Sequence, residues 1–342
     1  MTEESPPTSQ LSVDIPTTGM ATITGPVTSS TSRGTEFYFH CVVLIIGVVG
    51  TATNALILYA LVASKQHKKH VLIVNQNALD LFSSFFVVAT YSLKLCNIRL
   101  SGSVGYWLCM LLFSNSLTHS GTIGSAINLA SISVERYLKV VHPTWSKNKL
   151  HNWMIHSAMA FSWIASFIYN AAFVFSTSAV VDGACYAYAF WKTKAARIFH
   201  DIWSFVSFYV IILLIFIFCY WRILIVIRRQ ASVMAGHNAN GPSTSQTISN
   251  QIQSNVIKTM ILVSAFYAIS WLPLYIFVLN MNLKPNPTPP DISYHVSVGI
   301  VFLYIGANPF IYATKFDPVR KVLRRMILCK KAEEASESVA TR

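Results

Sequence analysis

The fold of this chain is decided by apolar runs such as Val210-Ile211-Ile212-Leu213-Leu214-Ile215-Phe216-Ile217-Phe218, in the fifth of seven segments long enough to cross a membrane. A helix needs about 20 residues to cross a bilayer core of roughly 30 Å. The seven segments are 37-64, 71-95, 106-140, 151-177, 200-228, 255-281 and 293-315. Backbone polar groups find no water partner in lipid, so each segment is expected to be a helix. The quoted run also lacks alternation at period two, which excludes a membrane β-barrel.

The composition also indicates a membrane protein. Hydrophobic residues make up 53% of the 342 residues, charged residues make up 11%, and the mean hydropathy is +0.48. A soluble domain is about 25% charged. The predicted fold is therefore an all-α membrane protein, a seven-transmembrane helix bundle with a short amphipathic eighth helix.

Other classes of membrane protein fit the sequence poorly. A transporter is expected to show broken helices, or an internal repeat with ionisable residues near the membrane midplane. A membrane enzyme needs a nucleophile with its base, or a metal cluster. The sequence shows neither pattern, and the acids of the spans are scattered. We therefore expect no enzymatic activity and no catalytic residue.

The distribution of Lys and Arg predicts the orientation, because short cytoplasmic loops retain positive charge. Placing the N-terminus outside leaves nineteen of the 26 basic residues inside, and puts these seven outside: Arg33, Lys94, Arg99, Lys192, Lys194, Arg197 and Lys284. The N-terminus is thus expected to be extracellular and the C-terminus cytoplasmic. The net charge of +13 mostly reflects this asymmetry. It predicts a basic surface facing anionic lipid of the bilayer, and no nucleic-acid partner.

The chain divides into four regions by composition. Residues 1-36 are rich in Thr, Ser and Pro and are expected to form a disordered extracellular tail. Residues 37-315 hold the seven spans. Residues 316-329 repeat apolar positions every three or four residues with Arg and Lys between, which predicts a helix lying flat on the membrane. Cys329 ends this helix as a candidate for palmitoylation, with a plain free cysteine as the alternative, and 330-342 form a cytoplasmic tail.

Polar residues inside membrane spans are costly and point to functional sites. Asp80 lies in the second span and Asn54 in the first. A lone carboxylate in the membrane must be protonated, paired or bound to an ion. If the spans form one bundle, the natural polar neighbours of Asp80 are Asn54, Ser125 and Asn308.

Seven positions in the expected helices and in the expected order resemble the rhodopsin-like (class A) family of G-protein-coupled receptors over about residues 37-330. They are Asn54, Asp80, Glu135-Arg136-Tyr137, Trp163, Tyr220, Ser270-Trp271-Leu272-Pro273 and Asn308-Pro309-Phe310-Ile311-Tyr312. The resemblance implies a multi-pass receptor of the plasma membrane that activates a heterotrimeric G protein. Val141-His142-Pro143 after Glu-Arg-Tyr looks most like the galanin, allatostatin and somatostatin group of peptide receptors.

The resemblance assigns the activation switch. Arg136 is implied to be held by Glu135 at rest, beside Tyr137, and released toward the G protein on activation. Many relatives have a second acid at the base of the sixth helix, but this chain has Gln253, eighteen residues before Trp271. A latch between the third and sixth helices therefore lacks its usual acid. Thr144, where a bulky apolar residue is common, favours inhibitory G proteins.

Further switch positions lie in the last three spans. By resemblance, Trp271 is the aromatic floor of the ligand pocket. Pro273 removes a backbone hydrogen bond, which predicts a kink in the sixth helix. Tyr220 resembles a tyrosine that meets a second one, Tyr312, through water in the active state, and Tyr312 closes the motif that Asn308 and Pro309 begin.

Asp80 with Ser125 and Asn54 resembles the sodium site of the family, in which the ion favours the inactive state. Tyr304 and Ile305 replace the usual Asn and Ser before Asn308. A protonated or water-linked Asp80 is the alternative to a sodium ion. No other cofactor is expected.

The resemblance also implies a disulfide between Cys109 and Cys185, in an oxidising compartment. Cys109 lies 27 residues before Arg136, whereas the family usually shows about 25, which indicates an insertion or bulge. Cys96 is the rival partner for Cys185.

The ligand class is predicted mainly from residues that are missing. Amine receptors need a carboxylate where this chain has Thr118, and opsins need a lysine where it has Phe302. If the resemblance sets the helix faces, the upper bundle presents Tyr91, Lys94, Thr118, His119, Thr122, His200, Asp201, Trp271, Tyr275, Tyr294 and His295. This polar and aromatic lining suits an extracellular peptide. A small lipid or melatonin-like ligand, or a ligand-independent receptor, is the alternative.

Overall fold

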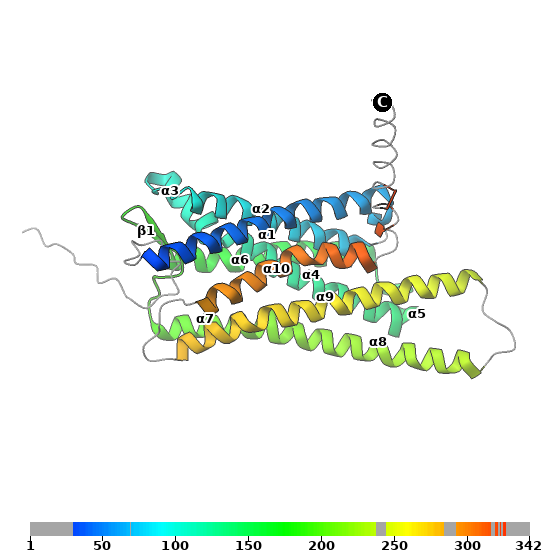
Figure 1. The fold of residues 1–342 in the computed structure, drawn as a ribbon. Coiled ribbons are helices and arrows are strands. Elements are labelled where there is room, and N and C mark those ends of the chain that lie inside the picture. Colours follow the sequence, from blue (N-terminus) through cyan, green and yellow to red (C-terminus); the bar gives the residue numbers. More distant parts are fainter. Residues whose placement is uncertain are drawn as a thin grey trace, which may run out of the picture.

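The computed structural model describes residues 30–68, 70–236, 244–283, 292–315, 319, 320, 322, 324 and 325. Long helices run side by side, and a two-stranded hairpin lies at one end (Figure 1). The helices are α1 (Ser30–Ala63), α2 (Val71–Leu95), α3 (Gly102–Leu108), α4 (Ser116–Val141), α5 (Pro143–Lys149), α6 (Asn152–Thr177), α7 (Lys194–Phe205), α8 (Ile211–Gly236), α9 (Thr244–Leu283) and α10 (Ile292–Lys315), and the strands are β1 (Ala179–Val181) and β2 (Ala184–Tyr186). We call the end with β1 the hairpin end and the end with α5 the α5 end.

Six membrane-length apolar segments occur among the described helices: 34–63, 71–95, 152–177, 194–229, 257–281 and 292–311. α4 supplies the third predicted span and is more polar, with many buried Ser, Thr and Asn residues. It packs against α2, α6 and α8, so much of its surface faces protein instead of lipid. The predicted seven-helix bundle is confirmed.

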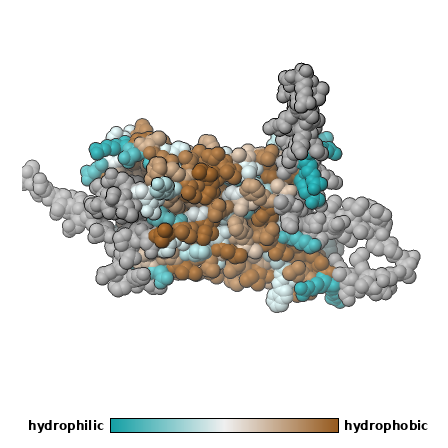
Figure 2. Space-filling model, in the orientation of Figure 1, coloured by the Kyte–Doolittle hydropathy of each residue, from teal (hydrophilic) through white to brown (hydrophobic). Residues whose placement is uncertain are grey.

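The surface of the bundle is what a lipid environment requires. Figure 2 shows a broad hydrophobic band around the middle of the molecule, with hydrophilic residues toward its two ends. Within the run that predicted the fold, Leu214 is 59% exposed and Ile217 is 55% exposed, whereas Phe216 is buried. A helix with one face inside the bundle and the other in lipid explains why the whole run is apolar.

The third span is broken, contrary to the prediction of one helix over 106-140. α3 passes into a π-helical turn at Cys109–Phe113, and Asn115 then adopts a left-handed conformation with φ 57° before α4 begins. The hydroxyl of Thr90 donates to the carbonyl of Leu112 at 3.2 Å, which satisfies a polar group at the break. The long spacing between Cys109 and Arg136 is explained by this break.

The disulfide between Cys109 and Cys185 is present, with the two Cα atoms 5.3 Å apart. It ties the third span to the hairpin, where Val180 pairs with Cys185. Asp182 and Gly183 both have positive φ at the turn, as a two-residue hairpin loop requires. Cys96 is a free, exposed cysteine, so the rival pairing with Cys185 is wrong.

The predicted boundaries shift at both ends of the bundle. α1 begins at Ser30, inside the segment expected to be a tail, and α9 begins at Thr244, eleven residues before the predicted start of its span. Among the residues predicted to form the amphipathic helix, Val319 is buried while Arg320, Arg324 and Arg325 are exposed. Residues 1–29, Cys329 and the tail 330–342 lie outside the described residues.

The disulfide should stabilise the folded protein against its reduced form. Replacing Cys185 with Ser is expected to lower the free energy of unfolding by about 2–4 kcal/mol, because the bond closes a loop of 76 residues. Thermal unfolding of the purified protein in detergent measures this. Cys96→Ser is the matched control and should leave the melting temperature unchanged. An equal loss in both variants would contradict the assignment.

Candidate functional site

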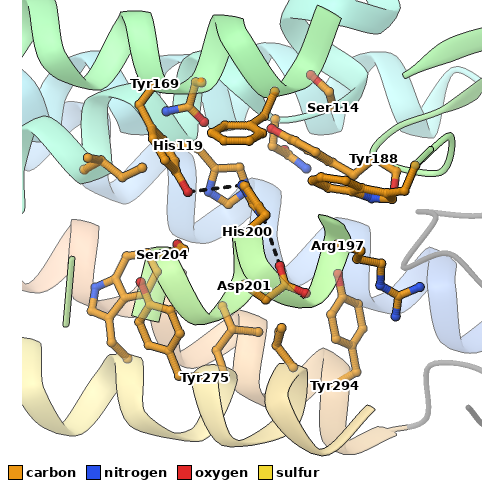
Figure 3. A pocket seen from close by; sticks show the side chains of 18 residues that line it. Ser114, His119, Tyr169, Tyr188, Arg197, His200, Asp201, Ser204, Tyr275 and Tyr294 are labelled. Atoms are coloured by element: carbon orange, nitrogen blue, oxygen red, sulfur yellow. Dashed lines mark hydrogen bonds and ion pairs between the residues drawn. The ribbon is translucent and has the colours of Figure 1, made fainter. Parts of the chain in front are cut away.

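The first element of the site is a cavity of about 200 Å³ toward the hairpin end (Figure 3). Its walls come from α4, α6, α7, α9, α10 and the segment that follows β2. Six residues predicted from the sequence line it: His119, His200, Asp201, Trp271, Tyr275 and Tyr294. Polar and aromatic groups therefore converge on one cavity, as expected of a ligand pocket.

The register of α4 differs from the one that the resemblance implies. The third span presents to the cavity Asn115, directly before α4, and His119 and Ile123 of α4, each four residues apart. Thr118 and Thr122 do not line the cavity; each is 2% exposed, and the Thr122 hydroxyl donates to the Thr118 carbonyl at 2.7 Å. One residue along a helix is a rotation of about 100°. The prediction that these two threonines line the pocket is corrected accordingly.

Tyr91, Lys94 and His295 do not line the cavity either. They belong to a neighbouring aromatic cluster of α1, α2 and α10, in which His295 lies 4.8 Å from the ring of Phe39. The Tyr91 ring contacts Phe302 at 5.6 Å, and the Lys94 ammonium lies 4.8 Å from the centre of the Tyr91 ring. Lys94 is 8% exposed, and the Tyr91 ring is a cation–π partner for its buried ammonium.

A chain of hydrogen bonds crosses the cavity wall. The hydroxyl of Tyr169 lies 3.1 Å from Nε2 of His200, and Nδ1 of His200 lies 3.0 Å from Oδ1 of Asp201 (Figure 3). Phe173 packs on the imidazole at 4.2 Å between ring centres. His200 is thus fixed from three sides, and it orients the carboxylate of Asp201 within the pocket.

The loop after β2 supplies part of the cavity lining. Tyr188 and Trp191 reach the cavity, and the indole N–H of Trp191 donates to the Tyr188 carbonyl at 2.8 Å. Burial raises the pKa of the Tyr188 hydroxyl, so Tyr188 remains a neutral hydrogen-bond donor at ordinary pH. The loop follows Cys185 directly, so the disulfide helps to hold this wall in place.

An aromatic column leads from the cavity toward the middle of the bundle. Trp271 is 7% exposed at the cavity and lies 6.1 Å from Tyr267, which lies 5.6 Å from Tyr304. Two tyrosines also join the fifth and sixth spans. Tyr209 donates to the carbonyl of Ala268 at 2.9 Å, and Tyr267 donates to the carbonyl of Phe208. Both bonds form beside the π-helical turn Val206–Val210 and within two turns of Pro273.

Asp80 is the centre of a buried polar core. Its two carboxylate oxygens accept hydrogen bonds from Ser125 at 2.8 Å and from Asn308 at 2.9 Å. The side-chain amide of Gln76 in turn donates to the Ser125 hydroxyl oxygen. Asn54 instead bonds the carbonyls of Gly50, at 2.9 Å, and Ile305, at 3.4 Å. The predicted neighbours of Asp80 therefore meet in one region, with Asn54 bonded to the backbone.

Residues near this core also offer free oxygens. Oδ1 of Asn308, Oδ1 of Asn54 and the hydroxyl of Tyr304 are buried and lack a hydrogen-bond partner in the part of the chain that the structure describes. Sodium ions take carboxylate, hydroxyl and amide oxygens. This donor set fits a monovalent cation, although Tyr304 and Ile305 occupy positions where the family has smaller polar residues.

A second network ties α4 to α2 and α6. Asn75 donates to Asn128 at 2.9 Å and to Ser162 at 3.3 Å, and the indole N–H of Trp163 donates to Asn75 at 2.9 Å. These contacts satisfy polar groups that lipid could not. Trp163 is therefore placed in the packing of three helices.

The α5 end of α4 carries an ion pair. Arg136 lies 3.2 Å from one carboxylate oxygen of Glu135, and both residues are less than 10% exposed. The hydroxyl of Tyr137 lies 3.2 Å from His142. Tyr220 lies in the same part of the bundle, bonded to Ser133 at 2.8 Å and to Ser264 at 3.2 Å. The side chains of Tyr312 and Gln253 lie outside the described residues.

Residues 53–312 match the sequence profile of the 7 transmembrane receptor (rhodopsin family). The chain belongs to this family. It is a receptor and not an enzyme, related to receptors for peptides among others.

Individual relatives are distant. The receptor is 23% identical to mouse (Mus musculus) galanin receptor type 1, over 89% of this chain and 86% of that one. It is 25% identical to human (Homo sapiens) somatostatin receptor type 3, over 84% of this chain and 67% of that one. It is 23% identical to mouse trace amine-associated receptor 7d, but that match spans only 64% of the relative. The structure of squid rhodopsin has the same fold, with a TM-score of 0.70 and 17% identity. The match covers 86% of this chain and 85% of squid rhodopsin.

Sequence reasoning missed part of the receptor's cavity lining. The unpredicted residues are Ser114, Asn115, Ile123, Tyr169, Asn170, Phe173, Tyr188, Trp191, Arg197, Ser204, Leu274 and Val278. The four-residue spacing of Tyr169 and Phe173 in the fourth span could have indicated a shared face. The loop residues carry no such signal, because the disulfide and the hairpin decide where they lie.

Proposed function

We propose that this receptor binds an extracellular ligand in the cavity at the hairpin end and activates a heterotrimeric G protein at the α5 end. The observation that carries the proposal is the placement of both sites on one helix. His119 lines the cavity and Arg136 forms the ion pair, and α4 is unbroken between them. Seventeen residues of helix span about 26 Å, close to the thickness of a bilayer core. The hairpin end then lies outside the plasma membrane, as the basic residues predict.

A peptide is the ligand that we propose. The cavity offers a carboxylate on Asp201, a guanidinium on Arg197 and several aromatic rings. Those groups suit the termini and side chains of a peptide, of which the terminal residues enter while the rest lies over the mouth. The matches to galanin and somatostatin receptors along most of the chain support this class.

A small nonpeptide ligand, such as a lipid or a melatonin-like compound, is the alternative. The cavity volume of about 200 Å³ is too small for a whole peptide, since even pockets for drug-sized ligands measure about 300–1,000 Å³, and this favours a small ligand. A simple amine is a weaker candidate because the third span presents His119 to the cavity and no carboxylate.

The aromatic column gives a physical route for activation. A ligand that displaces Trp271 changes its packing on Tyr267, whose hydroxyl joins α9 to the fifth span. Pro273 lacks a backbone N–H, so α9 bends there more easily than elsewhere. Outward motion of α9 at the α5 end would break the bond between Ser264 and Tyr220 and expose Arg136 to a G protein. We favour the inhibitory class of G protein because Thr144 stands where a bulky apolar residue is common.

Replacing Arg136 with Ala should abolish coupling, because the guanidinium is the group offered to the G protein. Sensors for all four Gα classes, in cells that express the receptor and are exposed to a peptide library, measure this. Ligand affinity should stay within about three-fold, since the cavity lies roughly 26 Å away along α4. Intact coupling in Arg136→Ala would contradict the assignment of Arg136 as the group that contacts the G protein.

The register of α4 predicts which neighbour touches the ligand. His119→Ala should weaken the potency of an activating peptide by about ten-fold, the loss expected for one hydrogen bond in a buried pocket. Thr118→Val, a change of similar volume at the adjacent position, should leave potency unchanged. Dose–response curves at matched surface expression measure both. A larger loss of potency in Thr118→Val than in His119→Ala would show that Thr118 faces the ligand, as the family resemblance implies.

Asp80 would hold a sodium ion together with oxygens of Ser125, Asn308 and Tyr304. The ion would add positive charge beside a buried carboxylate and so stabilise the resting arrangement. Replacing potassium with sodium should raise the melting temperature of the purified receptor, and Asp80→Asn should remove the difference. Equal melting temperatures of the unmodified receptor in both salts would contradict sodium binding and favour a protonated or water-linked Asp80.

We also propose palmitoylation of Cys329, which would fix the amphipathic segment to the lipid surface. Metabolic labelling with a palmitate analogue tests this, with Cys329→Ser as the control.

A further inference from the structure

Arg136 has a second contact besides Glu135. One guanidinium nitrogen, Nη2, lies 3.4 Å from Nδ1 of His70, the residue that precedes α2. Arg136 is 9% exposed, and its Nε has no hydrogen-bond partner in the part of the chain that the structure describes. The arginine is therefore buried between its neighbour Glu135 on α4 and His70, which precedes α2.

Glu135 is shared between two cations. Its Oε1 lies 2.5 Å from the ammonium of Lys139, while its Oε2 lies 3.2 Å from Arg136. The shorter contact is the one to lysine. A carboxylate divided in this way holds Arg136 less strongly than one that serves the arginine alone.

The sixth span offers no carboxylate to compensate. Residues 232–290, which include all of α9, contain neither Asp nor Glu. A charged latch between Arg136 and this helix is excluded by the sequence itself. The resting position of Arg136 therefore depends on groups from other elements.

His70 is well placed to supply such a group. Its backbone N–H donates to the carbonyl of Gln66 at 3.0 Å, and its carbonyl accepts from Ile73 at 3.0 Å and Val74 at 3.1 Å. The imidazole thus projects from a backbone fixed at the start of α2. Because a guanidinium can only donate, Nδ1 of His70 must be the acceptor, which requires the neutral ring with its hydrogen on Nε2.

We propose that His70 is a positioning residue that holds Arg136 in the resting receptor, in the role that a helix-six acid cannot fill in this chain. The inference rests on the proposed coupling to a G protein. It predicts that loss of the Nδ1 acceptor frees Arg136 and raises activity in the absence of ligand.

The test is basal G-protein activation, read with the four Gα sensors and normalised to surface expression. His70→Ala should raise basal activity about five-fold, the effect of losing one weak hydrogen bond to a charged group. His70→Lys should raise it further, because it places a cation beside Arg136. His70→Asn should stay within about two-fold of the unmodified receptor, because its amide oxygen takes the place of Nδ1.

Two controls accompany these variants, and the first separates this role from a general effect on folding. His67→Ala, three residues earlier in the same loop, should leave basal activity unchanged, since no contact joins His67 to Arg136 among the described residues. Adding Arg136→Ala to His70→Ala should remove the gain.

The outcomes distinguish the inference from the proposed function. Unchanged basal activity in His70→Ala and His70→Lys, in a receptor that a peptide activates, would overturn the inference alone. A gain that His70→Asn shares, or that survives Arg136→Ala, would also overturn it. Silence of every variant toward all four Gα classes, at normal surface expression, would overturn both.

Discussion

The cost of an unpaired polar group in hydrocarbon governs this structure. It forces every span to be helical and directs polar side chains into the bundle. α4 is buried among α2, α6 and α8, and it supplies Ser125 to the network at Asp80 and Asn128 to the network at Asn75. At the break beside Asn115, the Leu112 carbonyl accepts from Thr90 and the backbone N–H of Ser116 donates to Ser114. The helix that could least face lipid is thus the one that connects the two ends of the receptor.

This arrangement explains how an event at one end can reach the other. The cavity floor at Trp271 packs on Tyr267 and through it on Tyr304, beside the polar core. α9 is joined to the fifth span by tyrosine–carbonyl bonds near its proline, and to α4 by way of Tyr220. These hydrogen bonds have two natural arrangements, formed and broken, so a small displacement at the cavity can select between two states of the bundle.

The fold could be predicted from the sequence because hydrophobic length and charge asymmetry are strong signals. The motifs around Asp80, Arg136 and Trp271 placed the core and the ion pair in the correct helices. The cavity was predicted only in part, since a left-handed residue at Asn115 sets which face of α4 it meets and apolar periodicity does not encode that. Tyr188 and Trp191 depend on the disulfide and the hairpin. His70 was missed because the motif directs attention to an acid on the sixth helix.

The central claim is that ligand binding in the cavity moves α9 away from α4 at the α5 end. The distance between spin labels at the exposed positions Lys147 in α5 and Lys258 in α9 measures it most directly, in a receptor whose free cysteines are replaced. The account predicts that an activating peptide with nucleotide-free G protein lengthens this distance by about 5 Å or more, one helical turn. An unchanged distance in a preparation that still activates the G protein would contradict it.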